Sequence, residues 1–399
     1  MSQTARAAER AARDSYGRLL AFLAARTGDI ALAEDALAEA FAAALTHWPT
    51  RGVPDTPDAW LLRVARNSMT DRQRHIARFH SPEEPPEMAA PDNTEADALP
   101  DDRLALLLVC AHPAIARDLH TPLMLQTVLG LDAATIADVF MVSAPALAKR
   151  LVRAKSKVRD ARIPFVIPGP DALPERAEAV MEAVYAAHTV DWLAPLDMMG
   201  GEALYLAELL ARLLPDLPEA RGLAALIAYG HARRAARVVD DVLVPTDQQD
   251  VALWDADLWR YGDQHLTAAL AHAAPGRFQI EAAIQQVHMA RAATGATDWT
   301  ALNKLYFALL QVAPSAGALV AQAVVTGKVH GSAAGLAALD AAAGSIGAEV
   351  QAMWAARADL LAEAGEVAQA RAAYDQAISL TQDVPLVRFL QARRAALNG

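Results

Sequence analysis

The spacing of apolar residues constrains the fold of this chain more than any other feature. Ala and Leu dominate, and apolar residues recur three and four positions apart through most of the 399 residues. This spacing lines apolar side chains along one face of an α-helix. The alternation of β-branched and aromatic residues that is typical of strands is nearly absent. We therefore expect an all-α protein without a substantial sheet.

Charge divides the chain into four stretches. Residues 1–80 hold 11 basic and 9 acidic side chains, and residues 103–163 hold 9 basic and 4 acidic ones. Between them, residues 81–102 hold five prolines, eight acids and no Lys or Arg, which predicts a flexible acidic linker. Residues 164–399 hold 16 basic and 26 acidic side chains. We expect two near-neutral to basic modules, 1–80 and 103–163, followed by an acidic region.

Some classes of protein are disfavoured by what the sequence lacks. The single cysteine, Cys110, cannot form an internal disulfide, and the charged N-terminal residues do not resemble a signal peptide, so we expect a cytoplasmic protein. Residues 305–327 are uncharged, but Pro314 interrupts them, so we expect two buried helices and no membrane association. There is no Gly-rich phosphate loop, zinc-binding H-E-x-x-H or nucleophile elbow. We expect no catalytic residues, no metal site and no cofactor, and hence not an enzyme.

The first module reads as three helices, over residues 5–26, 30–48 and 58–79. Asp29 stands where it can cap the second of them. Residues 49–57 contain three prolines, which predicts a loop before the third helix.

The second module contains the pattern of a helix-turn-helix, after apolar helices expected over residues 104–111 and 122–129. Asp132 is placed to cap a short helix, Met141 and Val142 to form a tight turn, and Ser143 to cap the following helix. The rest of that last helix is basic, as expected for a helix that donates to the major groove and to phosphates. A solvated basic face on an ordinary helix is the alternative. Apolar residues at spacings of four, three and four predict a buried stripe, namely Leu147, Leu151, Ala154 and Val158.

Together the two modules resemble a bacterial sigma factor of the extracytoplasmic-function (ECF) type. Residues 29–48 (DIALAEDALAEAFAAALTHW) and 59–74 (AWLLRVARNSMTDRQR) are similar to two helices of region 2. Residues 130–159 are similar to region 4, in particular the run Arg150-Leu151-Val152-Arg153-Ala154. The chain departs from the family at Ala38, where Gln is frequent, and at Met141, where Gly is frequent. The resemblance implies a region 2 helical bundle and a region 4 helix-turn-helix.

The resemblance also implies roles for individual residues. Residues 29–48 are implied to bind the β′ clamp helices of core RNA polymerase, through Glu34, Asp35, Glu39 and Phe41. The third helix is implied to open and read the −10 promoter element, through Arg63, Arg66, Asn67, Asp71 and Arg74. The last helix is implied to read the −35 element, through Ser143, Lys149, Arg150, Arg153, Lys155 and Lys157. The polymerase β flap is a further implied partner.

Residues 164–399 extend beyond a minimal sigma factor. Residues 365–378 resemble the second helix of a tetratricopeptide (TPR) repeat, because small Ala370 and Ala377 allow close helix packing and Tyr374 fills the space between them. We expect a TPR-like helical domain that regulates the sigma modules, either by contacting them or by receiving a protein or peptide partner. A stabilising appendage, or a small-molecule pocket near Arg233 and Trp254, is the alternative.

The sequence thus predicts a sigma factor that binds core RNA polymerase and promoter DNA and directs transcription initiation. The competing hypothesis is a helix-turn-helix transcriptional regulator with a TPR-like domain that senses a partner or a ligand. A regulator of that kind binds duplex DNA without polymerase, which separates the two hypotheses.

Overall fold

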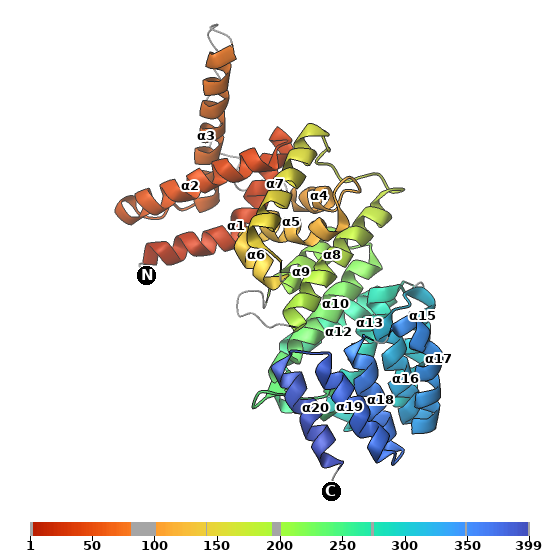
Figure 1. Ribbon diagram of the computed structural model, residues 1–399. Helices are drawn as coiled ribbons and strands as arrows, with labels where there is room; N and C mark the ends of the chain where they lie inside the picture. Colours follow the sequence, from red (N-terminus) through yellow and green to blue (C-terminus); the bar gives the residue numbers. More distant parts are fainter. Residues whose placement is uncertain are drawn as a thin grey trace. The chain divides into compact units, whose positions relative to one another are not determined.

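A computed structural model describes residues 3–80, 101–140, 142–193, 201–272, 275–347 and 349–397 (Figure 1). Side chains at 3–14, 71–80, 138–139 and 190–193 are outside this description. Within the described ranges, helices account for nearly all regular structure. The exception is one antiparallel hairpin, β1 (Val238–Val239) and β2 (Val242–Leu243). The prediction of an all-α protein is confirmed.

The described residues form two compact units, Met1–Ala203 and Leu204–Gly399. The first unit contains α1 (Gln3–Thr27), α2 (Ile30–Arg51), α3 (Pro57–His80), α4 (Arg103–Cys110), α5 (Arg117–Leu129), α6 (Ala133–Val139), α7 (Ala144–Asp160) and α8 (Leu173–Leu193). The chain passes from the first unit to the second within α9 (Glu202–Leu213).

The second unit continues with α10 (Pro218–Ala232), α11 (Arg234–Arg237), the β1–β2 hairpin and two short 3-10 helices, Thr246–Gln248 and Val251–Leu253. Its remaining helices are α12 (Ala256–Leu270), α13 (Arg277–Met289), α14 (Arg291–Thr294), α15 (Trp299–Val312), α16 (Ala316–His330), α17 (Ser332–Ile346), α18 (Gln351–Glu363), α19 (Val367–Ser379) and α20 (Val384–Ala396).

In the first unit, helices from both sides of the predicted linker pack together. α1 packs against α2 and α3, and also against α4 and α5. α7 packs against α2, α5 and α6, and α8 packs against α4 and α5. Leu19, Leu20 and Leu23 of α1 and Leu106 and Leu107 of α4 are almost entirely buried. The predicted modules therefore share one apolar core in this unit, although residues 81–100 of the linker lie outside the described part of the chain.

The close approach of α1 to α5 depends on Gly17. A Cβ added at position 17 would overlap the carbonyl oxygen of Val128 and lie 3.1 Å from the carbonyl carbon. Glycine carries no Cβ, so it lets the backbone of α1 lie against the backbone of α5. A glycine inside a helix is costly without such a packing reason.

Local capping in the first unit agrees with the sequence at two of three positions. Asp29 accepts hydrogen bonds from the backbone N–H groups of Ala31 and Leu32. Asp132 likewise accepts from Ala134 and Thr135. Ser143 occupies the N-cap position of α7, but its side chain makes no capping hydrogen bond.

Two predicted helix boundaries were wrong. α2 continues through Pro49 to Arg51, so the loop before α3 is shorter than the three prolines indicated. α5 begins at Arg117 rather than at Pro122, which lies inside it. The tight turn expected at Met141 and Val142 is only partly covered, because Met141 lies outside the described residues.

In the second unit, neighbouring helices pack in pairs: α15 with α16, α16 with α17, and α18 with α19 (Figure 1). Ala370, Tyr374 and Ala377 of α19 are buried in one cluster with Ala358 of α18, as the sequence predicted. The uncharged stretch 305–327 is divided between α15 and α16, which confirms two helices there. Among the described helices, none is long and apolar enough to cross a membrane.

Candidate nucleic-acid and polymerase interface

α7 separates an apolar face from a basic one. The predicted stripe of Leu147, Leu151, Ala154 and Val158 is buried. This face packs against α5 and α6. On the other faces, Ser143, Lys149, Arg153 and Lys157 are exposed, and all four belong to the predicted −35 contacts.

Two further residues predicted to contact the −35 element have partners within the protein. Arg150 forms an ion pair with Asp118 of α5, in which both side chains remain substantially exposed. A surface pair of this kind contributes little free energy, so it leaves the guanidinium free to change partner. Lys155 differs, because its side chain is only 7% exposed.

Lys155 reaches from α7 to the other predicted module. Its Nζ lies 2.5 Å from Oε2 of Glu34 on α2, and it donates a second hydrogen bond of 2.9 Å to Oε1 of Gln126 on α5. The Glu34 side chain is 17% exposed. Burial raises the pKa of the Glu34 carboxyl, and the nearby Lys155 ammonium opposes that shift. A residue expected to contact DNA is thus paired with a residue expected to contact polymerase.

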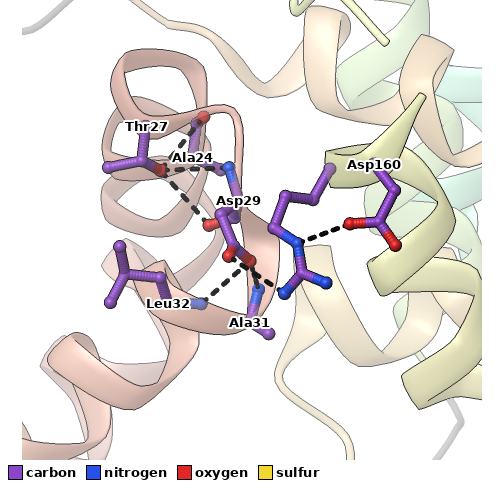
Figure 2. Close-up of polar contacts among 7 residues, drawn as sticks. Ala24, Thr27, Asp29, Ala31, Leu32 and Asp160 are labelled. Carbon is purple, nitrogen blue, oxygen red and sulfur yellow. Dashed lines mark hydrogen bonds and ion pairs between the residues drawn. The ribbon is translucent and has the colours of Figure 1, made fainter. Parts of the chain in front are cut away.

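A second polar contact joins the same two helices near the start of α2. Figure 2 shows Asp29, which caps α2, on the side that faces α7, and Asp160 on α7 across from it. Nη1 of Arg159 lies 3.7 Å from Oδ2 of Asp29, while Nε of Arg159 donates to Asp160. The carboxylate of Asp29 therefore serves both the helix cap and the contact between α2 and α7.

The other residues predicted to bind polymerase lie along α2. Asp35 and Glu39 are exposed, and Glu39 accepts a hydrogen bond from Ser68 of α3. Phe41 is partly buried and stacks on Tyr16 of α1, with ring centroids 6.4 Å apart. Acidic side chains at two of the four positions are thus exposed at the surface of α2.

The residues predicted to read the −10 element lie on α3, next to a cluster of aromatic rings. Arg63 and Asn67 are exposed, and the Arg66 guanidinium lies 5.1 Å from the centre of the Phe22 ring. The side chains of Asp71 and Arg74 lie outside the described part of the chain. Nearby, Trp48 packs edge-on against Trp60 with ring centroids 5.6 Å apart, which makes both rings part of the local packing.

The second unit holds a polar cluster around Arg233, where a small-molecule pocket was an alternative. Arg233 is almost completely buried and donates to Thr246 and Gln285. Asp250 caps the 3-10 helix Val251–Leu253, and Asp255 caps α12. These contacts fit a structural network. Among the described residues, no group of His, Cys, Asp or Glu is arranged to hold a metal ion.

Sequence reasoning missed the contacts that join the modules. These are the ion pair of Glu34 with Lys155, the ion pair of Asp29 with Arg159, and the close approach of Gly17 to Val128. The partners in each ion pair are more than 100 residues apart, so no local pattern brings them together. Gly17 inside an otherwise good helix pattern was the one available signal, because such a glycine often marks a close approach.

Comparisons with known proteins agree with part of this picture. Residues 12–79 match sigma-70 region 2. Residues 176–270 match a family of unknown function, DUF6596. An uncharacterized protein of Rhizobium meliloti (strain 1021) is 33% identical over 378 residues, which cover 90% of this chain and 88% of that protein. No solved structure matches the chain.

Proposed function

We propose that this chain, which belongs to the sigma-70 family and to one family with the Rhizobium meliloti protein, is an ECF-type sigma factor with a regulatory C-terminal domain. Sigma-70 region 2 gives the chain a role in transcription initiation, with core RNA polymerase and promoter DNA as partners. The sigma-70 family is not a family of enzymes. The ECF assignment, the −35 contacts and the role of the C-terminal region are the finer parts of the proposal.

One observation carries the ECF assignment and the −35 contacts. A sigma-70 region 2 match over residues 12–79 is followed in the same chain by the α6–α7 pair, whose second helix buries an apolar stripe and exposes cations. In this proposal, exposed Asp35 and Glu39 on α2 contact polymerase, and α3 acts at the −10 element. Region 2 also favours a sigma factor over a regulator that binds duplex DNA alone.

The test is transcription in vitro with purified core RNA polymerase, on the promoter upstream of the protein's own gene. We expect transcripts that depend on the added protein. Reversing the charge at both α2 positions, Asp35→Lys with Glu39→Lys, is expected to weaken co-elution with core polymerase. Duplex DNA binding without any polymerase interaction would overturn the proposal in favour of the regulator.

The −35 contacts have a test of their own in the complex with polymerase. Each phosphate contact contributes about −0.9 to the slope of log affinity against log salt concentration. We therefore expect Lys149→Gln and Lys157→Gln each to flatten that slope by about 0.9 if the lost ammonium contacts phosphate. An unchanged slope for both variants would mean that α7 is not part of the DNA interface.

For the C-terminal region we propose a TPR-like surface that binds a protein or peptide and regulates initiation. The paired helices α15 to α19 and the buried Ala370 and Tyr374 support this assignment. The comparison is between the full chain and a chain that ends at Ala203, which retains α8 on α4 and α5. A change of transcript yield in either direction supports regulation, and an equal yield refutes it.

A further inference from the structure

The exposed face of α7 carries a large apolar side chain among its cations. Val152 is 60% exposed, whereas the apolar stripe on the other side of the helix is buried. Lys149 lies three residues before Val152 and Ser156 lies four residues after it. Residues at these separations are neighbours on the surface of a helix. Val152 therefore lies on the face of α7 that is proposed to enter the major groove.

Folding does not explain a valine at this position. An exposed side chain gains little from burial, and a β-branched residue is a weaker helix former than alanine, lysine or arginine. Single exposed apolar residues are common on protein surfaces, so exposure alone carries no function. The place of Val152 is the informative observation, because the side chain lies between Lys149 and Arg153, which are both exposed and both predicted to contact the −35 element.

The geometry of the helix determines what Val152 can reach. Each residue advances the helix axis by about 1.5 Å, so Val152 lies about 4.5 Å beyond Lys149 and about 1.5 Å before Arg153. Successive nucleotides of one DNA strand are about 3.4 Å apart along the duplex. When the lysine and the arginine contact the groove, the valine methyl groups are therefore within reach of a base edge between those two contacts.

The chemistry of the major groove limits what this base can be. Thymine presents its C5-methyl group there, whereas the other groups that distinguish the base pairs are hydrogen-bond donors and acceptors. A valine side chain has no hydrogen-bonding atom, so beside a donor or acceptor it would exclude water without replacing the lost hydrogen bond. Against a methyl group it removes apolar surface of both partners from water, which is favourable.

We propose that Val152 reads a thymine of the −35 element through its C5-methyl group, between polar contacts from Lys149 and Arg153. The inference rests on the proposed function, and it adds a specificity-determining residue to those that the resemblance implied. Because the contact is made to the methyl group, a 5-methylcytosine at the same position substitutes in part for the thymine. Methylation of a cytosine there therefore increases affinity for the promoter.

The test removes the methyl group from the DNA and the valine from the protein, separately and together. The DNA is the promoter of the protein's own gene, and the protein is the full chain in complex with core RNA polymerase. Each thymine of the −35 element, on either strand, is replaced in turn by uracil, which pairs as thymine does but lacks the methyl group. Fluorescence anisotropy measures affinity at one fixed salt concentration, since phosphate contacts make binding salt-dependent.

Val152→Ser is the protein variant. Serine and valine have similar helix propensities and the position is exposed, so α7 should stay folded. The matched control, Val166→Ser, makes the same chemical change at a side chain that is 57% exposed in the connection between α7 and α8. Circular dichroism and co-elution with polymerase check that both variants are folded.

At one thymine, we expect uracil to lower the affinity of wild type and of Val166→Ser about fourfold, the change that corresponds to exposing one methyl-sized group. In Val152→Ser the same replacement should leave affinity unchanged. With a cytosine in place of this thymine, C5-methylation of the cytosine should raise the affinity of wild type about fourfold and should have no effect in Val152→Ser.

The outcomes separate this inference from the function on which it rests. If no uracil weakens binding by wild type, or if every uracil acts equally in wild type and Val152→Ser, then Val152 reads no methyl group, while the sigma-factor proposal stands. If the chain binds duplex DNA without any polymerase interaction, the sigma-factor proposal fails, and the same uracil series on the free chain decides the role of Val152. Absence of all DNA binding refutes both.

Discussion

Gly17→Ala offers the sharpest test of the packing that unites the first unit. Alanine is the better helix former by about 1 kcal/mol, so at an unconstrained site the change would stabilise α1. At position 17, however, the added methyl group would overlap the carbonyl oxygen of Val128. The obstructing atom belongs to the backbone of α5, so no side-chain rotation relieves the overlap.

The two effects have opposite signs, and their magnitudes decide the result. Overpacking in a close contact costs about 1–3 kcal/mol, and backbone obstruction puts Gly17→Ala near the upper end of that range. Subtracting the gain in helix propensity leaves a net loss of about 1–2 kcal/mol. A loss of that size corresponds to about a 5- to 30-fold change in the opening equilibrium.

Hydrogen exchange followed by mass spectrometry measures this loss where it occurs. Peptides from α1 and α5 report on the first unit separately from the second. We expect their slowest amides to exchange about 5- to 30-fold faster in Gly17→Ala. The control is Gly344→Ala in α17, where an added Cβ meets no atom within 4 Å. There we expect slower exchange, because alanine should add up to about 1 kcal/mol to the stability of the helix.

Exchange in α1 and α5 that is unchanged or slower in Gly17→Ala would refute the reasoning. It would mean that α1 does not approach α5 at this position, and the shared core of the two predicted modules would lose its support.

Three further predictions concern single sites. Asp29→Ala should destabilise the first turn of α2 by about 1 kcal/mol, because it removes the cap, and hydrogen exchange should show much less loss in Asp29→Asn, which keeps a capping oxygen. Tyr374→Ala should lower the free energy of unfolding of the second unit by about 3–5 kcal/mol, because it empties a fully buried site and removes the hydrogen bond to Asp359, and chemical denaturation measures this. Burial, with the nearby arginine charges, lowers the pKa of His288 to about 4, so the unfolded chain binds this proton more tightly than the folded one. Stability of the second unit should therefore fall as the pH drops from about 6.5 towards 4, by at most about 3 kcal/mol, and denaturation of His288→Gln should show a flatter pH profile.

The helices and caps of this chain were largely predictable because they depend on neighbours along the sequence. Apolar spacing of three and four placed the buried stripe of α7, and Asp29 and Asp132 cap helices through backbone groups two and three residues away. Even here, some local patterns predicted the wrong helix boundary or the wrong cap. Pro49 and Pro122 suggested helix boundaries but lie inside helices, and Ser143 stands at a cap position without making the bond.

The candidate site was predictable only as separate surfaces. Residue types and spacing indicated the basic helix α7, and the resemblance to sigma region 2 pointed to the acidic residues of α2. Their contact depends on how α1, α2, α4, α5 and α7 share a core, and burial in that core is a property of the packed unit.

The sequence by itself determined that this chain is helical, that α7 carries one apolar and one basic face, and that its first module belongs with sigma-70 region 2. Tertiary structure alone decided that Lys155 faces Glu34 rather than solvent and that Gly17 lies against Val128. The physical reason is the separation along the sequence between the residues that interact. Helix hydrogen bonds and caps join residues at most four positions apart, whereas the pairing of Glu34 with Lys155 depends on the burial of many side chains that only the folded unit brings together.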